Sequence, residues 1–73
     1  MGVTPGALLE LEARWPVHSG AKETAILDGL GIRPARFYQL LHRAAASVEG
    51  QAADPITAHR VLRRAARARR RAA

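Results

Sequence analysis

The chain has 73 residues, no cysteine and a formal net charge of +6, which predicts one small domain without disulfides or thiolate metal sites. Residues 1–50 carry five basic and five acidic side chains, whereas residues 51–73 carry seven arginines against Asp54 alone. Because all the net charge lies in the last third, we expect a polyanionic partner, either a nucleic acid or an acidic membrane surface.

Signals for targeting, metal binding and catalysis are missing from the sequence. It has no signal-peptide pattern and no apolar run long enough to cross a bilayer, so we expect a cytoplasmic protein. His18, His42 and His59 are too far apart along the chain to predict a metal site, and no glycine-rich loop indicates a cofactor. The acidic residues have no recognised catalytic spacing, so we expect a protein that is not an enzyme.

The sequence predicts an all-α fold, a small domain of three to four helices, because alanine and leucine are abundant and β-branched residues are sparse. The first helix is expected from Pro5 to about Arg14, with Thr4 as its cap. Leu8, Leu11 and Trp15 recur at three- and four-residue steps. They therefore predict the inner face of this helix, with Trp15 in the core.

The second and third helices are expected on either side of a glycine turn. The second begins near Gly20 or Ala21 after a Ser19 cap, and its predicted inner face is Ile26, Leu27 and Leu30. Gly29 and Gly31 bracket its end, where one of them is expected in the left-handed conformation of a sharp turn. The third helix is expected from Pro34 to about Ser47, and residues 48–54 are expected to form a short loop.

The last helix has a clear start signal at Asp54-Pro55, a cap followed by proline. Its inward residues are predicted to be Ile56, Val61, Leu62 and Ala65. A basic face follows from four- and three-residue spacing: Arg60, Arg64, Arg67 and Arg71, with Arg63 and Arg70 beside them. Beyond Leu62 the apolar face holds only alanine, so we expect a folded core over residues 1–62 and a basic arm over 63–73 that frays or extends.

The stretch from Ala21 to Ala46 fits a helix-turn-helix motif, with Gly31 at the turn. The positions that must lock its two helices together are apolar: Ile26, Leu30, Ile32, Phe37 and Leu40. Leu27 departs from the pattern, because a small residue is usual where this helix faces the next. The sequence therefore predicts that the third helix (34–47) docks in the major groove of DNA.

The exposed face of the third helix has the side chains that such a role needs: Arg33, Arg36, Tyr38, Gln39, His42 and Arg43. Arginine can bond guanine twice, glutamine can do the same with adenine, and arginine, tyrosine and histidine suit phosphates. No acidic residue occurs between Asp28 and Glu49, which favours an anion-facing surface over ordinary solvent exposure. Lys22, at the start of the second helix, and the arginines Arg60, Arg63, Arg64 and Arg67 complete the predicted DNA-binding set.

Four blocks of the sequence resemble a small actinobacterial family of unknown function: Leu8–Trp15, Gly20–Glu23, Arg36–Gln39 and Asp54–Arg64. Phe37, Pro16 and Arg33 depart from the family pattern, which tends to have tyrosine, an aromatic residue and serine there. The stretch LGIRPARFYQLLHRA is also similar, more generically, to DNA-binding region 4 of sigma factors. The resemblance implies a DNA-binding helix-turn-helix fold and supplies no target sequence.

The predicted function is therefore a DNA-binding protein of the transcription-regulator kind, located at the nucleoid, with double-stranded DNA as partner. Two alternatives stay open, a non-specific nucleoid-associated protein that coats DNA and an adaptor that binds RNA polymerase. Membrane binding is disfavoured because the basic helix lacks a wide apolar face. The leucines of the first helix are needed for the core, so we expect a monomer or a dimer that forms only on DNA.

Overall fold

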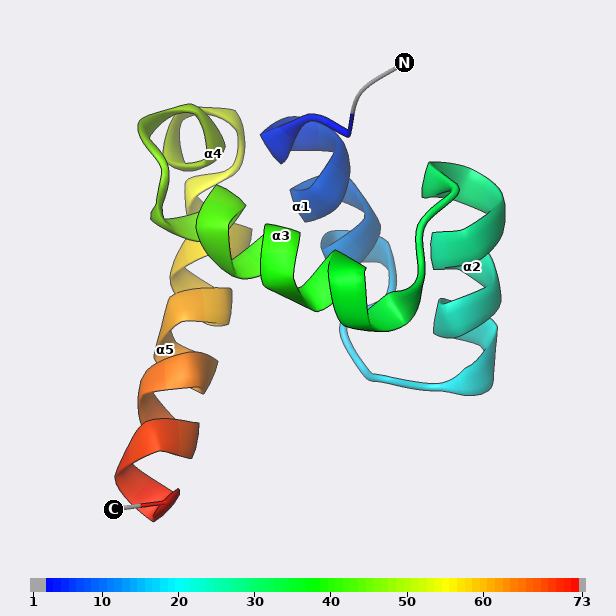
Figure 1. The fold of residues 1–73 in the computed structure, drawn as a ribbon. Helices are drawn as coiled ribbons and strands as arrows, with labels where there is room; N and C mark the ends of the chain where they lie inside the picture. Colours follow the sequence, from blue (N-terminus) through cyan, green and yellow to red (C-terminus); the bar gives the residue numbers. More distant parts are fainter. Residues whose placement is uncertain (1–2, 73) are drawn as a thin grey trace.

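The computed structural model describes residues 3–72, which form five helices and no strand (Figure 1). In chain order these are α1 (Pro5–Arg14), α2 (Gly20–Leu30), α3 (Pro34–Ala46), α4 (Val48–Ala53) and α5 (Pro55–Ala72). The all-α prediction is confirmed, and the expected caps are present, since Thr4, Ser19 and Asp54 accept bonds from the first turns of α1, α2 and α5.

The structure has more helices than the sequence predicts, because residues 48–53 are helical where the sequence predicts a loop. Ser47 makes this possible because its hydroxyl both donates and accepts a hydrogen bond. Its hydroxyl donates to the carbonyl of Ala44 at 2.7 Å, which closes α3, and accepts from the N–H of Gly50 at 2.9 Å, which starts α4. The corner is so tight that a Cβ on Gly50 would lie 1.8 Å from the Ala44 carbonyl oxygen, so only glycine fits there.

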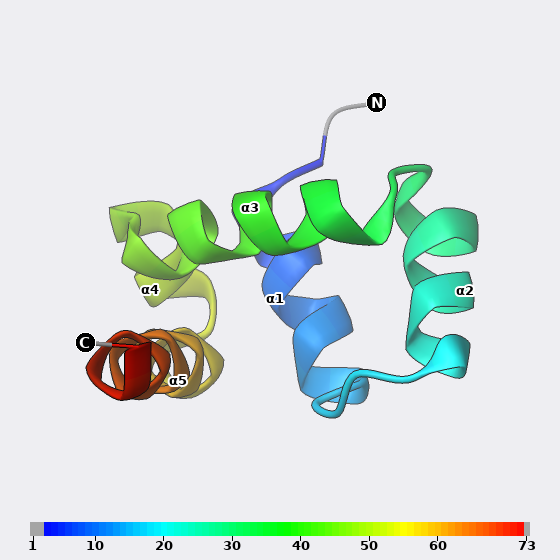
Figure 2. The ribbon, with the colours of Figure 1, turned by 60° about the horizontal axis from the view of Figure 1, so that its bottom comes forward.

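The core forms where α3 crosses α1, with α2 at one end of α3 and α4 and α5 at the other (Figure 2). Its buried members are contributed by α1, α2, α3 and α5: Leu8, Leu9, Ile26, Phe37, Leu41, Ala44, Ala45 and Ala58. Val61 and Leu62 pack against this cluster, as predicted, and are half-buried. One face of α3 is therefore packed in the core, while its opposite face is exposed.

Three large apolar residues predicted inside the core are exposed, and each has a geometric reason. Trp15 is 37% exposed because α1 ends at Arg14 and turns Leu8, Leu9 and Glu12 inward. Leu27 is half-exposed because it lies on the side of α2 away from buried Ile26. Ile56 is 77% exposed because α5 meets the body only from Thr57 and Ala58 onward.

The turn between α2 and α3 follows the prediction. Gly31 has φ 67° and ψ 24°, the left-handed conformation, and its N–H donates to the Leu27 carbonyl at 3.0 Å. Arg33 precedes α3 without capping it through its side chain, and Pro34 starts the helix. As a result α3 leaves α2 at a steep angle, visible in Figures 1 and 2.

The C-terminal segment is also helical. Residues 63–72 continue α5 as a helix, and residue 73 lies outside the described residues. The division into a folded core over residues 1–62 and a basic arm over 63–73 stays a prediction. Ala65 and Ala66 are half-buried, whereas every residue from Arg67 to Ala72 is exposed. The final turns therefore stand clear of the body, as Figure 1 shows.

Candidate nucleic-acid interface

The outer face of α3 presents five of the six side chains predicted for it. Arg33, Arg36, Gln39, His42 and Arg43 are all exposed, since Phe37, Leu41, Ala44 and Ala45 occupy the opposite side of the helix. Arg36 donates from Nη1 to Oε1 of Gln39 at 3.3 Å, so the two side chains lie together on this face. The outer face of α3 therefore presents hydrogen-bond donors, one of them a side-chain amide, and no carboxylate.

Tyr38, the sixth predicted residue, is less available. Its ring is half-buried and meets Phe37 edge-on, with centroids 5.1 Å apart. Its hydroxyl lies 2.8 Å from Nδ1 of His18, whose Nε2 is 3.3 Å from Oε2 of Glu23. Tyr38 therefore ties α3 to the segment before α2, a contact that the sequence does not predict.

The prediction that Lys22 binds DNA is wrong, because its side chain cannot reach a phosphate. The residue is 0% exposed, and its Nζ lies 2.5 Å from Oε1 of Glu12, which is itself buried. The same Nζ lies 5.6 Å and 5.0 Å from the ring centroids of Phe37 and Tyr38. A buried ammonium persists only with such partners, so Lys22 is a structural residue of the α1–α2–α3 junction.

Glu12 also binds a second cation, Arg64 of α5. Arg64 Nη1 lies 3.6 Å from the other Glu12 carboxylate oxygen and donates to the Pro16 carbonyl at 3.2 Å. The Arg64 side chain remains 59% exposed, so one edge of it still faces solvent. The buried position of Glu12 could be predicted from the sequence. Glu12 follows Leu8 at a four-residue step, which places a carboxylate on an apolar helix face.

The remaining arginines of α5 differ in exposure. Arg63 and Arg67 are exposed, as are Arg69, Arg70 and Arg71, whereas Arg60 is half-buried. Nε and Nη2 of Arg60 are buried and have no hydrogen-bond partner among the described residues. Hydrogen bonds from the side chain and backbone of Thr57 lower the pKa of the Asp54 carboxyl below its ordinary value of 3.8, and the charge of Arg60 adds a smaller effect in the same direction.

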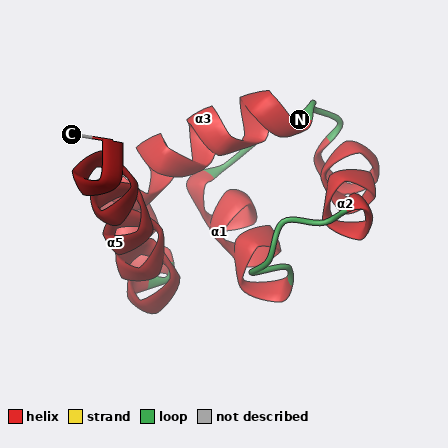
Figure 3. Ribbon diagram, turned by 90° about the horizontal axis from the view of Figure 1, so that it is seen from below, coloured by secondary structure: helices red, strands yellow, loops and turns green. Residues whose placement is uncertain are grey.

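The two basic helices border the same side of the molecule. In Figure 3 α3 lies along the upper edge, the C-terminal end of α5 projects to the same level at the left, and α1 lies below α3 and beside α5. The exposed residues of α3 and the exposed arginines of the last α5 turns therefore face the same side but lie apart, because those turns extend away from α3 (Figure 1). The buried Lys22 belongs to neither group. The described residues contain no group of three or more potential metal ligands, and none of their helices is long and apolar enough to cross a membrane.

Comparison with known proteins gives one match. The model of the DUF3263 family, described as a protein of unknown function, matches residues 3–72. The chain belongs to the DUF3263 family. No curated protein and no solved structure matches it. Membership of a small family of unknown function is thereby confirmed for this DUF3263 chain, while the likeness to sigma-factor region 4 stays an expectation.

Proposed function

We propose that this DUF3263 protein binds double-stranded DNA as a helix-turn-helix protein, with α3 in the major groove and α5 on flanking phosphates. The observation that carries the proposal is the outer face of α3, where five donor-rich side chains are exposed and no acidic residue occurs. The steep α2–α3 turn at Gly31 supports it, since a recognition helix must project from its neighbour to enter the groove. A transcription regulator at the nucleoid fits this chemistry better than an enzyme.

Within this proposal Arg36 and Gln39 read the bases, and the arginines of α5 bind phosphates. Arg36 and Gln39 are exposed and hydrogen-bonded to each other in the free protein, so the two side chains lie together on the outer face of α3. On DNA this bond is exchanged for bidentate contacts, with arginine on guanine and glutamine on adenine. Each such pair supplies roughly 1–3 kcal/mol of discrimination against the wrong base.

The decisive experiment is selection of bound sequences from random DNA at two salt concentrations, followed by measurement of Gln39→Ala and Arg36→Ala on the enriched site. Both variants are expected to lose about tenfold or more in affinity for that site and much less for random DNA. Arg14→Ala is the matched control, because Arg14 is an exposed arginine of α1 paired only with Glu10. Unchanged discrimination by Gln39→Ala would exclude α3 as the reader.

A second candidate, a protein that coats DNA without sequence preference, is favoured by the exposed arginines at the end of α5. Phosphate contacts supply affinity and carry no sequence information. In the selection experiment this alternative predicts binding at low salt, no enriched motif, and complete competition by random DNA.

A further inference from the structure

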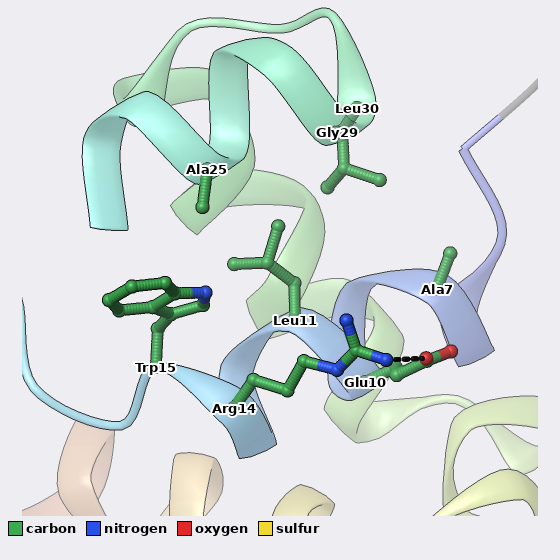
Figure 4. A pocket seen from close by; sticks show the side chains of 8 residues that line it. All are labelled: Ala7, Glu10, Leu11, Arg14, Trp15, Ala25, Gly29 and Leu30. Atoms are coloured by element: carbon green, nitrogen blue, oxygen red, sulfur yellow. Dashed lines mark hydrogen bonds and ion pairs between the residues drawn. The ribbon is translucent and has the colours of Figure 1, made fainter. Parts of the chain in front are cut away.

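A groove lies between α1 and α2 on a part of the molecule that the proposed DNA contacts do not use. Leu11 of α1 and Trp15, directly after α1, line one wall, and Ala25, Gly29 and Leu30 of α2 line the other (Figure 4). The two helices run antiparallel (Figure 1) and lie on the same side of α3 (Figure 2). The groove therefore follows the helix axes and is bordered by neither the outer face of α3 nor the arginines of α5.

The groove remains open because the backbones of α1 and α2 do not pack closely against each other, although the buried Glu12–Lys22 pair joins the two helices. The residues that line the groove do not include that pair. The space is about 260 Å³ and extends along α1 from Ala7 to Trp15, about 12 Å at the helical rise per residue. Trp15 stands at one end with 37% of its surface exposed, and tryptophan is among the side chains most enriched at the centres of binding surfaces.

The charges at its rim give the groove a neutral character. Glu10 and Arg14 are paired with each other at 3.2 Å, and both are exposed. Arg14 is already paired with the Glu10 carboxylate, so a polyanion finds no free cation in the groove. A ligand would therefore be attracted by apolar contact. This distinguishes the groove from the basic surface formed by α3 and α5.

The dimensions of the groove indicate which kind of apolar ligand it fits. Small-molecule sites are usually about 300–1,000 Å³ and enclosed, so this open groove is small for one. A stable pairing of two copies needs about 20–30 residues on each side, whereas eight residues line this groove. A slot parallel to two helices, with an aromatic side chain at its end, matches the mode in which an amphipathic helix inserts apolar residues into a groove.

We propose that the α1–α2 groove binds a short amphipathic helix of another protein, which inserts one or two large apolar side chains between Leu11, Trp15 and Leu30. Since α3 and α5 stay uncovered, such a partner can be held while the basic surface is engaged elsewhere. Recognition is apolar, so binding is nearly independent of salt, in contrast to the steep salt dependence of phosphate contacts.

The test uses a display library of amphipathic helices about 14 residues long, panned on the full chain with excess heparin to occupy the arginines. An enriched peptide is then titrated while the fluorescence of Trp15, the only tryptophan, is followed. We expect a shift in emission on binding and an affinity that changes little with salt. We expect Gly29→Leu to weaken binding by about tenfold or more by filling the groove.

Gly20→Leu is the matched control, because Gly20 is also on α2, and added Cβ atoms at positions 20 and 29 meet nothing within 4 Å. Both variants are expected to keep the wild-type helicity, and Gly20→Leu to bind the peptide normally. Trp15→Ala, at an exposed site, should weaken peptide binding as Gly29→Leu does. Because this variant has no tryptophan, its binding is measured by calorimetry, with the wild type measured in the same way. Three results would overturn the proposal: no enrichment of apolar-faced peptides, equal binding by Gly29→Leu and wild type, or sedimentation showing that a second copy fills the groove.

Discussion

At the scale of single residues, Glu12 has the largest structural consequence. Its carboxylate is buried and lies between Lys22 of α2 and Arg64 of α5, two helices that have little contact with each other. One side chain of α1 thereby fixes the positions of both. Burying these charges is costly, and the pairing is what offsets the cost.

Replacement of Glu12 by alanine is expected to destabilise the fold by about 3–5 kcal/mol, because the Lys22 ammonium is then buried without a carboxylate. Urea unfolding followed by circular dichroism measures this change. Glu10→Ala is the control on the same helix, since its exposed pair with Arg14 contributes about 0–1 kcal/mol. Equal losses for the two variants would show that the Glu12–Lys22 pair does not hold the junction.

At the scale of elements, the α3–α4 corner decides where α3 ends. Ser47 closes one helix and opens the next, and Gly50 allows the backbones to approach. The sequence predicts a loop at this corner, because a six-residue helix with an internal glycine has low intrinsic propensity. The stability of α4 comes instead from packing on α1, α3 and α5.

Gly50→Ala is expected to destabilise the protein by about 1–3 kcal/mol, as overpacking against the Ala44 carbonyl does, despite the better helix propensity of alanine. Gly29→Ala is the matched control, because its Cβ meets no atom within 4 Å. There the same change should stabilise by about 0.5–1 kcal/mol. Thermal unfolding of the two variants compares them, and a stabilised Gly50→Ala protein would contradict the corner geometry.

At the scale of the whole molecule, most of the residues that carry the net charge lie outside the core. The core is built from α1, α2, α3 and the first half of α5, while the residues from Arg67 to Ala72 are exposed and bury nothing. The last turns of α5 contribute little to folding, so their arginines are available to bind a polyanion, and each bound phosphate would add to the salt dependence of binding.

Removal of residues 67–73 is expected to leave the unfolding free energy within about 0.5 kcal/mol of wild type, because the described residues among them are exposed. DNA affinity at low salt should fall for all sequences alike. The slope of log K against log salt should decrease by roughly one unit for each phosphate that the shortened protein no longer binds. Fluorescence anisotropy at several salt concentrations measures both. A truncated protein with an unchanged slope would show that the end of α5 does not contact DNA.

The sequence alone determined α1, α2, α3 and the start of α5, but not α4, because caps, prolines and the glycine turn act through local backbone chemistry. The residues that do what their positions predict are Thr4, Ser19, Gly31, Pro34 and Asp54. The sequence also determined which face of α3 is polar, since that face follows from the helical period. Burial depends instead on what lies opposite each side chain. Only the tertiary structure could place Trp15 outside, turn Lys22 inward onto Glu12, and open the groove between α1 and α2.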